Sequence, residues 1–211
     1  MPHMQYSPFT SLQNLVRQRD ARERCEICGA GISSAHQHLI EPIARKLACA
    51  CDACALLFDS ATKTKYKRVP RRVLVLDDFQ MTDNEWDSLL IPIGMAFFFE
   101  SSPQQATLAI YPSPAGATES LLPLGAWQEI VARNPVLARM EPDVEGLLVN
   151  RLGSPGHPGE YYLAPIDRCY ELVGTLRTHW RGLSGGSEVW KQVGRFFEQL
   201  RSQATTGAAR A

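Results

Sequence analysis

Most of the cysteines of this chain are crowded into one stretch of thirty residues. Five of its six cysteines and two of its five histidines fall there, in the order Cys25, Cys28, His36, His38, Cys49, Cys51 and Cys54. A Cys-x-x-Cys unit presents two thiolates on one tight turn, and two such units can close a tetrahedron of sulfur around a metal ion. The spacing of the two pairs therefore predicts one metal ion bound by Cys25, Cys28, Cys51 and Cys54.

The residues around these ligands predict a small zinc fold. Residues 35–40 and 47–51 read as two short strands, and the Ala-Leu-Leu-Phe that follows Cys54 reads as the first turn of a helix. A knuckle, a hairpin and a helix that supplies the last ligands form the layout of a treble clef or zinc ribbon. Zinc is the expected metal, with iron or an iron–sulfur cluster as the open alternative, because four cysteines also suit iron.

Three further ligand-type residues lie between the knuckles: His36, His38 and Cys49. Strand alternation places the two histidines on one face and places Cys49 on the same face as Cys51, which Cys49 can then replace. One reading is a second metal site, or an open zinc that holds a water. The other reading is a buried thiol beside histidines that hydrogen-bond sulfur or backbone. Because four cysteines already fill a tetrahedron, we expect metal content to survive loss of either histidine.

Composition and the positions of structure-breaking residues predict two folded parts with short flanking segments. At 45% hydrophobic and 21% charged residues, the chain has ordinary globular composition. We expect an N-terminal helix and lead-in over 1–24, a zinc module with a basic segment over 25–70, an α+β domain over 71–201, and a disordered tail over 202–211. The proline at position 70 marks the boundary between the two main parts.

The larger part predicts a sheet with helices packed on it. Strands are expected at 73–76, 93–100, 106–111, 144–152 and 161–164, and helices at 81–90, 124–133, 166–180 and around 189–200. The proline-rich stretch 112–118 reads as a loop that does not continue the sheet. The expected class is α+β: a small N-terminal treble-clef or zinc-ribbon module, then a mainly antiparallel sheet covered by helices.

The zero net charge hides an uneven distribution of charge. Residues 17–72 hold twelve Lys and Arg against six Asp and Glu, while the remainder holds ten against sixteen. The basic segment is formed by Lys63, Lys65, Lys67 and Arg68. With Tyr66 among them, these residues can hold nucleic-acid phosphates and stack on a base. They can equally dock on an acidic protein, or on the acidic part of this same chain, or form a solvated edge.

No residue stands out as catalytic. No serine or cysteine has a recognisable nucleophile context, Cys169 reads as packed core, and the glycine-rich stretch 182–187 lacks the spacing of a phosphate-binding loop. The longest apolar run, residues 91–99, is too short to span a bilayer. Paired cysteines without a secretory signal predict a cytoplasmic protein that holds metal rather than disulfides.

One local segment resembles a nuclease family. His36-Gln-His38-Leu-Ile-Glu-Pro, between two cysteine pairs, is similar to the HNH nucleases, in which a treble clef carries a second metal that acts on phosphodiesters. After Cys54 the sequence departs from that family, because it lacks the later Asn and His that would hold the second metal. The resemblance implies the treble-clef fold and leaves nucleic-acid binding as a lesser alternative.

Over nearly its whole length, from Cys25 to Leu200, the chain resembles an uncharacterised bacterial family encoded beside actinobacterial-type nickel–iron hydrogenase genes. The motifs that carry the resemblance are Cys25-Glu-Ile-Cys28-Gly29, the stretch 48–58 around Cys51, Ile91-Pro-Ile-Gly-Met-Ala-Phe-Phe-Phe99, the stretch 111–124 and Arg181-Gly-Leu-Ser-Gly-Gly186. The resemblance implies an accessory protein whose partner is a hydrogenase subunit or an assembly factor.

Overall fold

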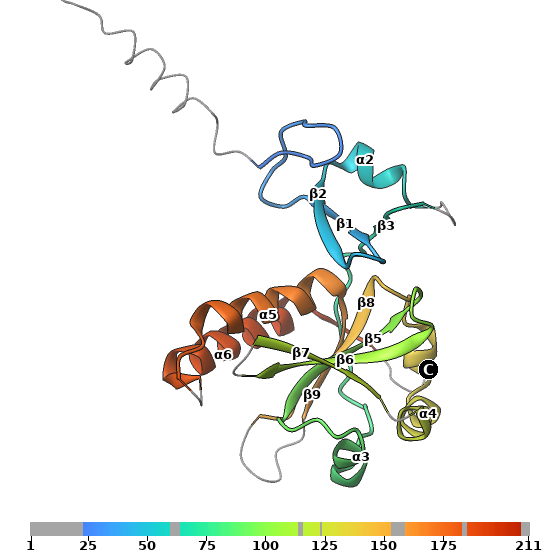
Figure 1. The fold of residues 1–211 in the computed structure, drawn as a ribbon, viewed down its shortest axis with the longest axis vertical. Coiled ribbons are helices and arrows are strands. Elements are labelled where there is room, and N and C mark those ends of the chain that lie inside the picture. Colours follow the sequence, from blue (N-terminus) through green and yellow to red (C-terminus); the bar gives the residue numbers. More distant parts are fainter. Residues whose placement is uncertain are drawn as a thin grey trace, which may run out of the picture.

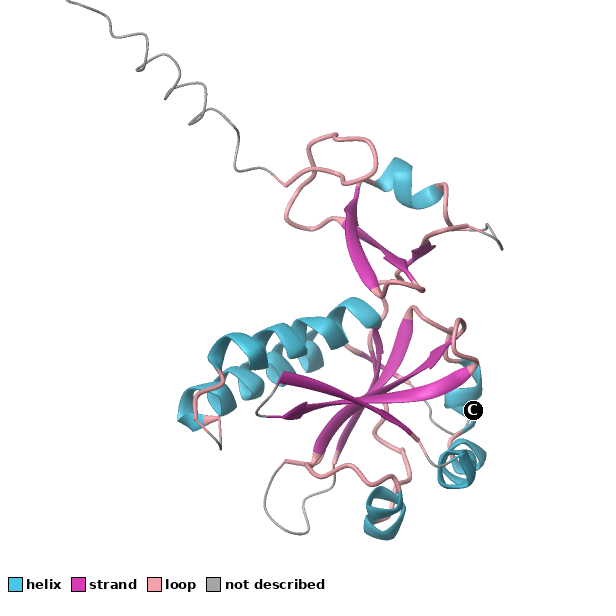
Figure 2. Cartoon of the chain, in the orientation of Figure 1, coloured by secondary structure: helices cyan, strands magenta, loops and turns pink. Residues whose placement is uncertain are grey.

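The computed structural model describes residues 23–59, 64–113, 116–122, 124–152, 159–182 and 185–207. The N-terminal helix expected within residues 1–24 falls on residues outside these ranges, except for residues 23 and 24, which are not helical. The described residues form a three-stranded sheet and a seven-stranded sheet with helices (Figures 1 and 2). The α+β class, with antiparallel sheets, helices and a cysteine cluster near the N-terminus, is confirmed.

The small sheet is built around one hairpin. Strands β1 (Gln37–Glu41) and β2 (Lys46–Ala50) pair antiparallel, and β3 (Lys67–Arg68) pairs antiparallel with the other side of β1. Helix α2 (Asp52–Leu56) begins directly after Cys51, whose side chain caps it. The knuckle, hairpin and helix thus follow one another as the sequence predicts.

The large sheet has the order β10-β4-β9-β8-β5-β6-β7, and only its β10–β4 pair is parallel. Its strands are β4 (Leu74–Val75), β5 (Met95–Ser101), β6 (Ala106–Ser113), β7 (Gly116–Leu121), β8 (Glu145–Asn150), β9 (Glu160–Pro165) and β10 (Thr205–Thr206). Its helices are α3 (Asp83–Ser88), α4 (Leu124–Arg133), the 3₁₀ helix η1 (Pro135–Arg139), α5 (Ile166–His179) and α6 (Gly186–Gln203).

Helices cover both faces of the large sheet (Figure 1). Alternation along β5 sends Phe97 to the face packed by α5 and α6, and sends Phe98 to the face packed by α3 and α4. Both rings are almost fully buried, at 1% and 0% exposure. The strand is therefore apolar at nearly every position, as a sheet covered on both sides requires.

The prediction of a loop over residues 112–118 is wrong for the residues that the structure describes. Strand β6 runs through Ser113 and β7 starts at Gly116, with Pro112 paired opposite Ala117. Proline lacks an amide hydrogen, so a strand tolerates it where a neighbouring strand does not need that donor. The pairing of β6 with β5 ends at Ile110, and Pro112 lies beyond that end.

The prediction of a disordered tail from Ser202 is also wrong as far as Gly207. Helix α6 continues to Gln203, and Thr205 and Thr206 add a parallel strand beside β4. The short β4 offers an otherwise unpaired edge, and the amides of Thr205 and Gly207 donate to the carbonyls of Val73 and Val75 at 3.0 and 2.9 Å. Pairing of backbone groups outweighs the polar composition of this segment. Residues 208–211 lie outside the described ranges.

Candidate metal centre

The four predicted cysteine ligands lie on two turns that face each other. The first turn is closed by the Gly29 amide, which donates to the Cys25 carbonyl at 2.8 Å, and Gly29 has the positive φ of 77° that a glycine adopts without strain. The second turn is the start of α2, where the Cys54 amide donates to the Cys51 sulfur at 3.4 Å. Each turn thus presents two sulfur atoms, and the four sulfur atoms lie together.

The geometry of the cluster fits a closed tetrahedral site. The ligand atoms of Cys25, Cys28, Cys51 and Cys54 all lie within 4.8 Å of one another. Zinc–sulfur bonds of about 2.3 Å in a tetrahedron place sulfur atoms about 3.8 Å apart. The Cys28 and Cys51 sulfurs are 3.7 Å apart, which agrees with that spacing. The four cysteines can therefore hold one metal ion.

Negative charge is distributed unevenly over these thiols. Burial raises the pKa of Cys25, but hydrogen bonds from the backbone of Cys51 and Cys28 outweigh it and hold that pKa at about 6. Hydrogen bonding with the Cys28 thiol, and then burial, raises the pKa of Cys54 to about 12. A divalent cation at the centre would lower the raised pKa of Cys54, because a thiol that coordinates a metal loses its proton.

Cys49 does not lie with this cluster. It is paired directly with His38 across the hairpin, so the two side chains share the face of the small sheet opposite to Leu39 and Ala50. Leu39 and Ala50 pack with the four-cysteine cluster, whereas Cys49 forms a separate group with His36 and His38. The expectation that Cys49 can replace Cys51 is wrong, because Cys51 has already left the strand to cap α2.

The basic segment is paired with acids of the same chain. Lys65 lies 3.4 Å from Glu41, and Arg68 lies 2.8 Å from Asp59. Lys67 reaches the large sheet, where its ammonium is 2.6 Å from a carboxylate oxygen of Asp143. Lys63 lies outside the described residues. Contact with the acidic part of this chain is one of the roles that the charge distribution predicts for the basic segment. Lys67 makes such a contact.

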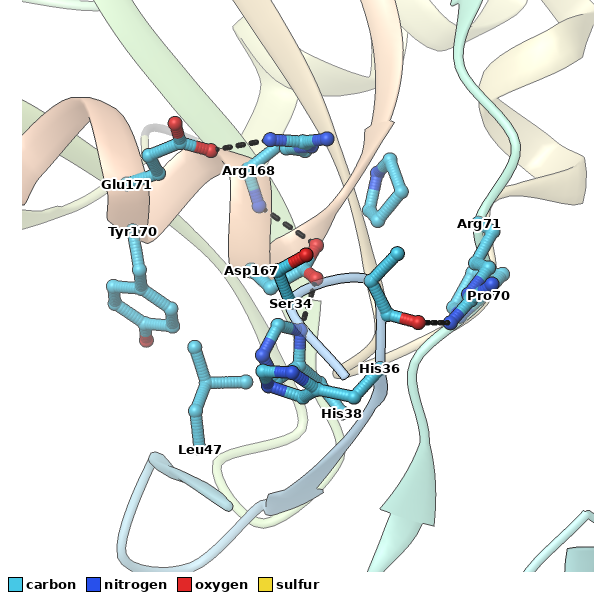
Figure 3. Close-up of a pocket in the computed structure, with 12 residues that line it drawn as sticks. Ser34, His36, His38, Leu47, Pro70, Arg71, Asp167, Arg168, Tyr170 and Glu171 are labelled. Carbon is cyan, nitrogen blue, oxygen red and sulfur yellow. Dashed lines mark hydrogen bonds and ion pairs between the residues drawn. The ribbon is translucent and has the colours of Figure 1, made fainter. Parts of the chain in front are cut away.

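Two acidic residues that matter here carry no local sequence signal. Asp143 is 3% exposed and accepts hydrogen bonds from Lys67 and from the Ser102 amide. Asp167, in the first turn of α5, accepts a hydrogen bond from His38 at 2.7 Å (Figure 3). Each joins the small sheet to the large one across more than seventy residues of chain. The one sequence feature that points to acidic partners for the small sheet is the excess of Asp and Glu outside residues 17–72.

Comparison with known proteins gives one match. The model of a family described as Family of unknown function (DUF5947) matches residues 24–204. No curated protein and no solved structure matches the chain. Among the described residues, no helix has both the length and the apolar character needed to cross a membrane.

Proposed function

We propose that this chain, which belongs to the family of unknown function DUF5947, is a zinc-binding accessory protein that acts by binding a protein partner. The observation that carries the proposal is the cluster of four cysteines. Four thiolates complete the coordination of zinc, and a site of this kind stabilises a fold and leaves no position for a substrate. The role that follows is presentation of a surface to a partner.

The setting that we propose is the maturation or assembly of a nickel–iron hydrogenase. Its support is the sequence resemblance from Cys25 to Leu200 to chains encoded beside such genes. The partner would be a hydrogenase subunit or an assembly factor. This part of the proposal rests on the resemblance alone, whereas the metal site rests on geometry.

Metal analysis tests the first part of the proposal. Protein purified without air should contain zinc, and Cys54→Ser should lose the ion of the four-cysteine cluster, because serine does not replace a thiolate on zinc. Cys169→Ala is the matched control, since that thiol is buried among the apolar residues between the large sheet and α5. Stoichiometric iron with visible absorption would contradict the zinc assignment and favour a redox or cluster-delivery role.

Deletion of the gene tests the setting. Cells that lack the protein should lose hydrogen uptake, with unprocessed subunits or unassembled complex, and the wild-type gene should restore it. The Cys54→Ser gene should not restore uptake. Normal hydrogenase activity, subunit processing and assembly in the deletion strain would refute the hydrogenase role and leave the zinc site untouched.

Lys65 is the residue of the basic segment best suited to meet an acidic partner. Its side chain is 62% exposed, whereas Lys67 is held by the buried Asp143. Lys65→Glu should weaken association with the partner, mostly through a slower association rate, since exposed charges steer encounter. Lys191→Glu on α6 is the control, because that exposed lysine lies on another element. Equal association of both variants would remove Lys65 from the interface.

A further inference from the structure

We propose that His36, His38 and Cys49 form a second metal site, which binds a zinc ion and leaves one coordination position open to the cleft beside α5. The inference goes beyond the proposed function, because that function needs only the four-cysteine cluster. It also replaces the expectation from the sequence that metal content survives loss of either histidine. One ligand atom from each of the three residues lies within 4.8 Å of the other two. Two imidazoles and a thiolate are a ligand set that zinc accepts, commonly with a water as fourth ligand.

The hairpin brings the three side chains together. His38 on β1 and Cys49 on β2 are directly opposite in the register. His36 directly precedes β1, two residues before His38, and its side chain lies against that of His38. Their rings meet edge to face, with centroids 4.8 Å apart. The grouping therefore follows from strand pairing, which also fixes it in place.

Both imidazoles are oriented with the same nitrogen free. Nδ1 of His36 lies 2.8 Å from the Ser33 carbonyl, and Nδ1 of His38 lies 2.7 Å from an oxygen of Asp167. A carbonyl or a carboxylate accepts a proton from Nδ1, which leaves the lone pair on Nε2. Histidines that bind metals are typically held in this way, by a carboxylate or carbonyl on the second nitrogen.

The strongest observation is at Nε2 of His36. This nitrogen is buried and has no hydrogen-bond partner, and the His36 side chain is only 9% exposed. A buried acceptor without a partner is unfavourable, so proteins rarely leave one. A metal ion bound to Nε2 would satisfy this atom. The thiol of Cys49 and a ring nitrogen of His38 lie within 4.8 Å of each other and of a ring nitrogen of His36.

The open position would face a cleft between the two sheets. The cleft has a volume of about 620 Å³, and its lining includes His36, His38, Asp167 and Arg71 (Figure 3). Two neutral imidazoles and one thiolate leave zinc with a net charge of +1. The fourth ligand would therefore be a water or a small anion. The charged residues that line the cleft are Arg71 and Arg168 with Asp167 and Glu171.

The distances require a modest contraction on binding. A tetrahedral site with these ligands has nitrogen and sulfur atoms about 3.4–3.6 Å apart, compared with the limit of 4.8 Å observed. His38 is the adjustable ligand, because its side chain is 31% exposed at the cleft. His36 is fixed by burial, and Cys49 is fixed by its amide, which donates to Glu26 at 2.9 Å.

Cobalt binding to the full chain tests the site. Protein with one zinc in the four-cysteine cluster is titrated with Co²⁺, which does not displace zinc readily from four thiolates because it binds more weakly. We expect one further equivalent, with the visible absorption of a thiolate-bound cobalt of low coordination number. Cys49→Ser and His38→Gln should each abolish that absorption and keep the first zinc. Asp167→Asn should weaken cobalt binding about 10- to 100-fold.

Two controls keep the outcome clear. His179→Gln removes a histidine whose ring bonds to the Thr175 carbonyl on α5, and it should leave cobalt binding unchanged. The zinc content of the wild-type protein before titration reports the four-cysteine cluster, so failure of the four-cysteine proposal is seen separately. The absence of a second equivalent in the wild-type protein would overturn the second site. Cobalt absorption that persists in both Cys49→Ser and His38→Gln, with folded circular dichroism spectra, would overturn it too.

Discussion

At the scale of single residues, one contact between the two sheets depends on a buried acid, Asp143. Asp143 is 3% exposed and has a positive φ of 72°, in the left-handed region that Asp tolerates better than most residues. Its two oxygens are shared between Lys67 and Ser102. The carboxylate is therefore compensated by an ammonium that belongs to the other sheet.

Replacement of Lys67 by methionine should lower the free energy of unfolding by about 2 kcal/mol. The variant keeps the length of the side chain but leaves Asp143 buried without a counter-charge, and the partial exposure of Lys67 limits the cost. Denaturant unfolding measures the change. Lys67→Met combined with Asp143→Asn should recover part of it. A loss of the same size in the double variant as the sum of the two single losses would show that the two groups do not interact.

The thiol of Cys169 should resist alkylation in the folded protein. It is 0% exposed, and burial raises its pKa, so the reactive thiolate is scarce even at pH 9. Labelling followed by mass spectrometry should show Cys169 modified only after unfolding, in zinc-loaded protein and after metal removal alike. Rapid labelling of Cys169 in folded protein would place it on a surface.

How much of the site could be predicted from the sequence depends on the distance between partners along the chain. Cys25 and Cys28, and Cys51 and Cys54, form turns of a few residues, so their spacing alone reveals them. The sequence does not reveal that the Cys49 side chain points away from Cys51, because this depends on β2 ending at Ala50. Asp167 could not be found, since it lies 129 residues from His38 and only the folded sheets bring them together.

At the scale of secondary-structure elements, close packing between β8 and its neighbours leaves no space at Gly146. A Cβ atom there would lie 3.1 Å from the Phe98 carbonyl oxygen and 3.3 Å from the Cys169 sulfur. Strand β5 and helix α5 thus approach β8 from two sides. The absence of a side chain is what lets α5 lie on the sheet at this point.

Gly146→Ala should destabilise the protein by about 1–2 kcal/mol, because the overpacking outweighs the entropy gained by replacing glycine. Gly194→Ala on α6 is the matched control. Its Cβ would meet nothing within 4 Å, and alanine in a helix interior should stabilise by about 1 kcal/mol. Thermal unfolding measures both. An unchanged or higher melting temperature for Gly146→Ala would show that β8 shifts to make space.

Elements were predictable where periodicity and end signals agree. The short helix α3 begins after Thr82, which forms a capping box with Glu85, and a Thr followed three residues later by a Glu is a start signal that the sequence shows. The strand β7 was missed because its composition, Gly-Ala-Thr-Glu-Ser-Leu, has little β character, and its pairing with β6 decides its conformation. The strand β10 was missed for the same reason, since the partner β4 lies at the other end of the sequence.

At the scale of the whole molecule, we expect metal to stabilise the two sheets unequally. The proposed division at Pro70 separates a part whose small core is the cysteine cluster from a part with two large apolar clusters. Chelation should increase hydrogen exchange of residues 25–59 strongly. The amides of β5, β8 and β9 should remain protected, because their packing involves no metal ligand. Simultaneous loss of protection in both parts would contradict the division and show a single cooperative unit.

Strand β1 has two buried faces, and this limits how the chain can change in length. Leu39 belongs to the core of the cysteine cluster, and its neighbour Ile40 belongs to the core of the large sheet. An insertion of one residue between them would exchange the two faces for every later position of the strand. In the turn at residues 42–45, the tip residue Ile43 is 86% exposed and belongs to neither core, while Arg45 at the end of the turn pairs with Glu119 of β7. Relatives of this chain should therefore vary in length near the tip of that turn and keep β1 free of insertions.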